Sequence, residues 1–214
     1  MTRSALRLLP ILALTAGLAS AADVEHRIRL GFDVLPTAVE SEITASSGGF
    51  SVGVDGEGEY ENAGRMTLQY SARIGEQVAA VIGGGLSYGQ AEFEDDSGEI
   101  AEFGGIVEGG LSLRLAPWFD LEAVIPLGFG GARLALGDND ANDDDEAEDV
   151  DGAYFDAALL LRPVVTLGEH VQLFGQVGYI VRRETFKDDD DRFDLELELE
   201  QDGLIAGLGV GVVF

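Results

Sequence analysis

Arginine and carboxylate side chains recur at every second position in several short segments of the chain. A guanidinium and a carboxylate form short, often bidentate hydrogen bonds, and an unpaired charge in an interior is costly. We therefore predict a structural network of ion pairs formed by Arg27, Arg29, Arg73, Glu108, Arg114, Glu122, Asp156, Arg162 and Arg182. Further carboxylates on the same faces are Glu25, Asp33, Glu102 and Asp120. The alternative is that these charges line a narrow path for small solutes or cations.

Residues suited to catalysis are sparse. The chain has two histidines, His26 and His170, and it contains no cysteine, no GxSxG motif and no HExxH motif. Common nucleophiles, bases and zinc ligands are therefore missing from the sequence in their usual patterns. Both histidines also fall at the ends of segments that lie away from the long polar stretches described below. We expect no enzyme activity and no cofactor.

An acidic segment from Asp138 to Asp151 is the strongest candidate for metal binding. It begins with the D-x-D-x-N pattern of a calcium loop, but Asp143 stands where such a loop needs glycine, and Asp149 stands where it needs glutamate. We predict a solvated acidic segment that attracts divalent cations diffusely rather than at a specific site. The weak candidate ligands are Asp138, Asp140, Asp143 and Asp145.

The charged positions lie on segments in which apolar and polar residues alternate strictly. In residues 24–34, for example, Ile28, Leu30 and Phe32 alternate with Arg27, Arg29 and Gly31. Such alternation places one apolar and one polar face on a β-strand. We predict eight strands, at about 24–34, 65–74, 77–90, 101–115, 119–133, 153–167, 171–183 and 202–214.

The connections between these strands alternate in length. Tight turns follow residues 74, 115 and 167, whereas long polar segments, which we expect to be loops, cover 36–64, 92–100, 137–152 and 184–201. Short turns on one side and long loops on the other are typical of outer-membrane barrels, and only a closed sheet satisfies every backbone amide in lipid. We predict an all-β, eight-stranded, antiparallel, up-and-down transmembrane barrel. A soluble eight-stranded barrel or sandwich is the alternative, but the arginines on the polar faces disfavour it.

The last strand carries a further signal. Its even positions are apolar and we expect them to face lipid, while its odd positions include three glycines that we expect to face a crowded lumen. With its terminal aromatic residue, this strand resembles the C-terminal insertion signal of bacterial outer-membrane proteins, carried here by Leu208, Val210, Val212 and Phe214. As a whole the chain resembles the small OmpA-type, OmpX-type and OmpW-type barrels. The resemblance implies outer-membrane lipid, lipopolysaccharide and the barrel-assembly machinery as partners.

Residues 193–200 alternate in the opposite phase to the last strand. Leucines occupy odd positions there, whereas the apolar positions of 202–214 are even. A change of phase requires a bulge or a break, and Gln201-Asp202-Gly203 is suited to one. We predict that 193–200 extends the last strand above the membrane and pairs with residues 179–186.

The N-terminal segment and the net charge indicate the compartment. Arg3 and Arg7 precede an apolar run that ends near Ala19-Ser20-Ala21, the pattern of a cleaved signal peptide. We therefore expect residues 1–21 to be removed on export and 22–214 to form the barrel in the cell outer membrane. The formal net charge of −27 excludes nucleic-acid binding. Two functions stay open: a structural or surface-interaction barrel with a filled lumen, or a narrow porin-like channel.

Overall fold

The computed structural model describes residues 24–47, 50–94, 98–136, 149–190 and 193–214. The expected signal peptide and the weak metal candidates Asp138, Asp140, Asp143 and Asp145 lie outside these residues. Within the described ranges, the structure contains no helix that is long and apolar enough to cross a bilayer.

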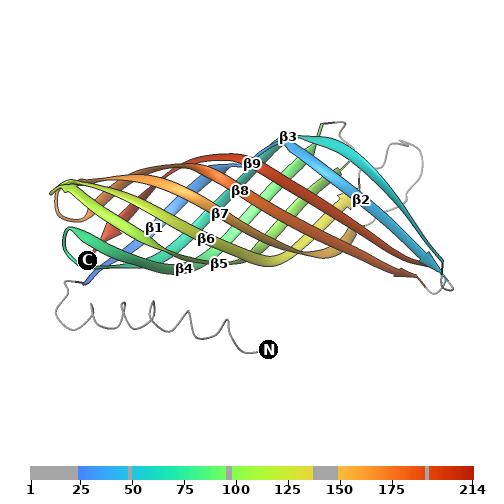
Figure 1. Ribbon diagram of the computed structural model, residues 1–214, viewed down its shortest axis with the longest axis horizontal. Coiled ribbons are helices and arrows are strands. Elements are labelled where there is room, and N and C mark those ends of the chain that lie inside the picture. Colours follow the sequence, from blue (N-terminus) through green and yellow to red (C-terminus); the bar gives the residue numbers. More distant parts are fainter. Residues whose placement is uncertain (1–23, 48–49, 95–97, 137–148, 191–192) are drawn as a thin grey trace, which may run out of the picture.

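In the part of the chain that the structure describes, nine antiparallel strands form one sheet that closes on itself (Figure 1). Each strand from β3 onward pairs with the next, and the ring closes where β1 pairs with both β9 and β3. The strands are β1 (Val24–Val34), β2 (Ala38–Ser47), β3 (Phe50–Ile74), β4 (Val78–Phe93), β5 (Gly98–Ala116), β6 (Phe119–Leu136), β7 (Asp149–Leu167), β8 (Val171–Asp190) and β9 (Phe193–Val213).

The first two strands together occupy a single place in the ring. Both β1 and β2 lie between β3 and β9, one above the other, and residues 35–37 separate them. The interruption is bridged by two backbone hydrogen bonds, from Leu35 N–H to the Ala63 carbonyl at 3.0 Å and from Tyr60 N–H to the Thr37 carbonyl at 2.8 Å. The nine strands therefore fill eight positions, and the predicted eight-stranded antiparallel barrel is confirmed.

Three of the four segments predicted as long loops are mostly strand, so that prediction was wrong in its detail. Residues 38–47 form β2 and 50–64 the outer part of β3, while 184–190 and 193–201 form the outer parts of β8 and β9. Of the segment 92–100, residues 92–93 belong to β4 and 98–100 to β5. In the fourth, 149–152 begin β7 and 137–148 lie outside the described residues. The acidic alternation of these segments is compatible with a strand because their charged side chains face water.

The predicted bulge at residues 201–203 is also absent from the ladder between β8 and β9. The pairing runs in constant register from Asp190↔Phe193 through Arg182↔Gln201 to Val171↔Val212. Residues 193–200 extend the last strand as predicted, but they pair with 183–190 rather than 179–186. Odd positions face inward on both sides of residues 201–203, as Leu199 and Ile205 at 4% and 0% exposure show. Apolar residues therefore move from odd to even positions because the apolar surroundings lie inside the outer extension but outside the lower barrel, not because the strand shifts its register.

The barrel accordingly has two zones of opposite polarity. Near the short turns the inward side chains are mainly polar and the outward ones are apolar. In the outer extension, where β2, β3, β8 and β9 project furthest (right in Figure 1), an apolar cluster faces inward and carboxylates face outward. This inversion is expected where a sheet leaves lipid for water, because the outer face then meets a polar solvent and the apolar residues must turn inward.

Candidate functional site

Charged side chains fill the barrel interior in two clusters. The cluster near the short turns, here called the turn-end cluster, consists of Glu25, Arg27, Arg29, Arg73, Glu108, Arg114, Asp120, Glu122 and Arg162. These residues come from β1, β3, β5, β6 and β7, whose polar faces converge on the barrel axis. The cluster holds five arginines and four carboxylates, so its formal charges nearly balance.

Glu122 is the centre of the turn-end cluster. Its carboxylate accepts hydrogen bonds from Arg29 Nη1 at 2.9 Å and Arg29 Nη2 at 2.8 Å, and another from Arg27. Arg162 lies 3.5 Å from its second oxygen. Glu122 and Arg27 are both 0% exposed. Hydrogen bonds between a buried carboxylate and several guanidinium groups are charge-assisted and strengthen one another.

Phe174 and Glu108 both contact arginines in the barrel interior. The guanidinium carbons of Arg29 and Arg162 lie 5.6 and 5.5 Å from the centre of the Phe174 ring. Arg162 also donates to Glu108 at 3.0 Å and to Gln176 at 3.0 Å. The aromatic ring and the ion pairs thus lie together in an interior of the kind that eight strands leave just wide enough for side chains.

The second cluster, here called the extension-end cluster, lies toward the projecting strands. Arg65 pairs with Asp156 at 2.9 Å and with Asp33 at 3.2 Å. Arg182 pairs with Glu184 at 2.9 Å and also with Glu102. This cluster holds two arginines and four carboxylates, all 5% exposed or less, so negative charge is in excess here.

The nine predicted network residues are all brought together in these two clusters, although not equally. Seven are nearly fully buried and ion-paired at close range. Arg114 is 35% exposed at the turn end. Arg73 lies 3.8 Å from Asp120 and donates mainly to the carbonyls of Gly75 and Glu76.

Two members of the extension-end cluster were missed by the sequence reasoning. Arg65 falls on the polar face of the predicted strand 65–74, and that position was the available signal for including it. Glu184 fell in a segment predicted as a loop, where no inward face was expected. Glu184 belongs to the cluster because β8 continues beyond Arg182 and stays paired with β7 and β9 there.

An apolar cap covers the extension-end cluster. Buried side chains converge there from six strands, β2, β3, β5, β6, β8 and β9. The ring centres of Tyr60 and of Phe93 on β4 lie 5.0 Å apart. Burial raises the pKa of the Tyr60 phenol, and the nearby Glu184 carboxylate acts in the same direction. The cap therefore lies on the outer side of the charged residues Glu102, Arg182 and Glu184. Its members include Leu35, Val39, Tyr60, Ile100, Leu134, Phe186 and Leu199.

Glu184 lies beneath this cap, next to the outward-facing Arg183, which is 55% exposed. Burial raises the pKa of Glu184 above its ordinary value, although the neighbouring Arg182 acts in the opposite direction. A carboxyl with a raised pKa favours the folded state at low pH, and that contribution is lost as the pH rises through the raised value. The native state thus resists ionisation of this group.

We expect Glu184→Gln to gain stability relative to the wild type as the pH rises from about 4 to about 8. Urea unfolding in detergent micelles at several pH values would measure the difference in free energy of unfolding. Glu42→Gln, on the exposed face of β2, is the matched control and should show no such trend. A difference that instead moves in favour of the wild type with rising pH would contradict the raised pKa.

The outer wall of the lower zone is a continuous apolar surface. Leu208, Val210, Val212 and Phe214 of the predicted insertion signal all face outward and are 69%, 49%, 51% and 63% exposed. Comparable exposure recurs in every strand around the ring, for example at Leu30, Leu68, Leu111, Ile125 and Leu159. So large an apolar surface is stable only in lipid. The role of these residues in assembly stays a prediction.

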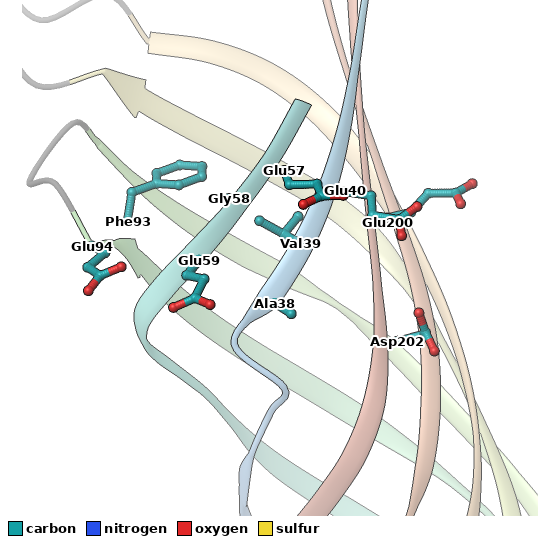
Figure 2. Close-up of a pocket in the computed structure, with 10 residues that line it drawn as sticks. All are labelled: Ala38, Val39, Glu40, Glu57, Gly58, Glu59, Phe93, Glu94, Glu200 and Asp202. Atoms are coloured by element: carbon teal, nitrogen blue, oxygen red, sulfur yellow. The ribbon is translucent and has the colours of Figure 1, made fainter. Parts of the chain in front are cut away.

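Near the projecting strands the surface becomes acidic and is hollowed. Figure 2 shows a hollow of about 650 Å³, where Glu40, Glu57 and Glu200 lie at the same level of three neighbouring strands. Within the described ranges, no group of three potential ligands among Asp, Glu, His and Cys has the geometry to hold a metal ion.

A closed antiparallel sheet, an apolar outer belt and a charged interior define the class of this protein. It is a transmembrane β-barrel of the outer-membrane type. No protein-family model and no curated protein sequence matches the chain.

Solved structures of similar fold are small outer-membrane barrels. OprG from Pseudomonas aeruginosa is 14% identical over 90% of this chain and 97% of its own, with a TM-score of 0.45. Ail of Yersinia pestis is 14% identical over 90% of this chain and 99% of its own, with a TM-score of 0.35. Neisserial surface protein A is 11% identical over 87% and 97%, with a TM-score of 0.39. These similarities concern the fold alone.

Proposed function

We propose that this protein is a non-enzymatic outer-membrane barrel with a closed lumen, and that its acidic outer extension carries its role as a structural or surface-interaction protein. The observation that carries the proposal is the turn-end cluster. Glu122, Arg27, Arg29 and Arg162 point into the lumen from β1, β6 and β7 and are at most 2% exposed.

The energetics of this cluster support a closed rather than an open interior. A passing ion would have to displace side chains that are paired to one another, and separating a buried pair costs about 3–5 kcal/mol. The apolar cap adds a second barrier, because its inward side chains offer a hydrated ion no polar partner. Two consecutive barriers of different chemistry favour a sealed barrel.

The outer extension supports a role at the cell surface. It projects beyond the apolar belt and presents carboxylates from β2, β3 and β9. We propose that it faces the exterior, where it meets lipopolysaccharide and the divalent cations that bridge neighbouring anions. We also propose that the C-terminal strand contacts the barrel-assembly machinery.

Planar-bilayer recording of the purified protein tests the closed lumen. We expect little steady conductance from the wild type under conditions in which an open porin conducts. An open-channel current with cation preference would instead favour the alternative function, a narrow porin-like channel. If such a current is found, replacing Glu40, Glu57 and Glu200 by glutamine should weaken its cation preference. A current with this behaviour would overturn the proposal of a closed lumen.

A further inference from the structure

The outer part of β3 forms one edge of the projecting sheet. Among the described residues, Ser51–Gly58 pair only with β2, because the pairing of β3 with β4 begins at Tyr60↔Phe93. The side of this segment that points away from β2 therefore has no strand partner in the described structure. A row of unpaired backbone N–H and C=O groups is a template for an additional strand.

The two faces of this edge differ sharply. On one face, Val52 and Val54 are 66% and 61% exposed, and Ile43 of β2, which stands opposite Val54, is 42% exposed. The other face carries the carboxylates of Asp55 and Glu57. A strand added at the edge would meet apolar and anionic side chains in strict alternation.

The anionic face is more strongly charged than the edge alone. Glu57 stands opposite Glu40, which stands opposite Glu200, and Asp55, Glu42 and Glu198 form a second row of three in the same way. Like charges directly opposite one another destabilise a sheet. The described basic partners are on β8, where Arg183 lies 2.8 Å from Glu200 and 2.9 Å from Glu198. Among the ion pairs of the described residues, none neutralises Asp55 or Glu57 at the β3 end of the two rows.

The only charged side chains of this edge segment are acidic. Natural edge strands are commonly protected by charged side chains, especially lysine, by proline or by a bulge. Ser51–Gly58 contain neither lysine nor proline, and their charges are the carboxylates of Asp55 and Glu57. Their carboxylates would repel a second copy of the same edge, since the chain as a whole is acidic. The edge is thus disfavoured for self-association and electrostatically suited to a cationic strand.

We propose that the free edge of β3 binds an extended partner segment in which basic and apolar residues alternate, by adding that segment to the sheet as a further strand. The proposal rests on the proposed function, because it names the chemistry of the surface partner. Basic side chains of the segment lie beside Asp55 and Glu57, and its apolar side chains cover Val52 and Val54.

Two synthetic peptides of identical composition test the proposal. One alternates lysine and valine over nine residues, and the other places all of its lysines before its valines. Both carry the same charge, so simple electrostatic attraction binds them equally. We expect the alternating peptide to bind the full-length protein in detergent micelles on the order of tenfold more tightly, because several cross-strand pairs contribute together.

Matched variants locate the binding surface. Asp55→Asn with Glu57→Gln neutralises the edge strand, whereas Glu40→Gln with Glu42→Gln removes the same charge from β2, one strand and about 5 Å further from the peptide. We expect the first pair to weaken binding several-fold more than the second. Val52→Thr with Val54→Thr keeps the shape and the strand propensity and should also weaken binding.

Amide hydrogen exchange gives the structural readout. The alternating peptide should protect backbone amides within residues 51–58 and leave those of β6 unchanged. Equal binding of both peptides, equal effects of the two neutralised pairs, or binding without protection at 51–58 would each overturn the proposal. These outcomes leave the conductance test untouched, so a failed docking surface and an open lumen are distinguished by separate measurements.

Discussion

Replacing Glu122 by alanine is expected to lower the free energy of unfolding by about 3–5 kcal/mol. Three arginines lie within 3.5 Å of this carboxylate, and all of them stay in the interior when it is removed. The loss arises mainly at Arg29, whose other carboxylate neighbour, Glu108, is 4.0 Å away, whereas Arg27 keeps Asp120 and Arg162 keeps Glu108. The cavity that alanine leaves adds to this loss.

Urea unfolding of the folded barrel, followed by heat-modifiable gel mobility, measures this effect. Arg114→Ala is an internal comparison and should cost less, because the Arg114 side chain is 35% exposed and water can replace it as a partner of Glu25 and Asp120. Glu108→Ala should resemble Glu122→Ala, since Glu108 pairs with Arg162 at 3.0 Å.

A double variant separates charge from packing. Adding Arg29→Met to Glu122→Ala removes one of the stranded charges and should restore part of the lost stability, even though it removes a further polar group. Two results would show that the turn-end cluster does not act as a coupled network. One is a free energy of unfolding for Glu122→Ala equal to that of the wild type. The other is a double variant that loses as much further stability on Arg29→Met as the loss of a separate buried ion pair would cause.

Leu208→Arg is expected to destabilise the barrel by about 2–4 kcal/mol and to reduce its insertion into membranes. Leu208 is 69% exposed and pairs with Phe32 and Gly175 within the apolar belt. Its exposure is to hydrocarbon rather than to water, so a guanidinium there loses its hydration.

Val52→Arg is the matched control for this prediction. Val52 is 66% exposed, almost the same fraction as Leu208, but it lies on the projecting part of β3. Arginine should be tolerated there. Folding into lipid vesicles of both variants provides the measurement, and an equal loss of folded protein in both would show that the assigned belt is wrong.

Val212→Asp should act in the same direction as Leu208→Arg but more weakly. It stands two residues from the end of the chain, near the margin of the belt, where a lipid-facing charge costs less.

The class of fold could be predicted from the sequence because the two sides of each strand meet different surroundings. In residues 24–34, Ile28 and Leu30 alternate with Arg27 and Arg29, and the structure places the first pair outward and the second inward. Most of the interior network followed from the same alternation, since a residue on the polar face of a barrel strand has only the lumen to occupy.

The pairing of these charges could not be predicted in this way. Arg27 bonds to Glu122, which is 95 residues away, and nothing in either segment indicates that partner. The choice depends on the stagger of the strands around the ring, because the stagger decides which inward positions share one level. Glu184 was missed for a related reason: its membership depends on how far the ladder of β8 continues.

The sequence by itself determined that the strands form a membrane barrel with arginines and carboxylates inside. It did so because the apolar residues of each alternating strand must face the apolar surroundings. Only the tertiary structure decided where that surrounding changes. Leu199 and Gly207 share one inward face of β9, yet one belongs to an apolar cap and the other to a polar lumen. The edge of β3 is likewise a property of the assembled sheet, since a strand has a free edge only when its neighbour ends before it does.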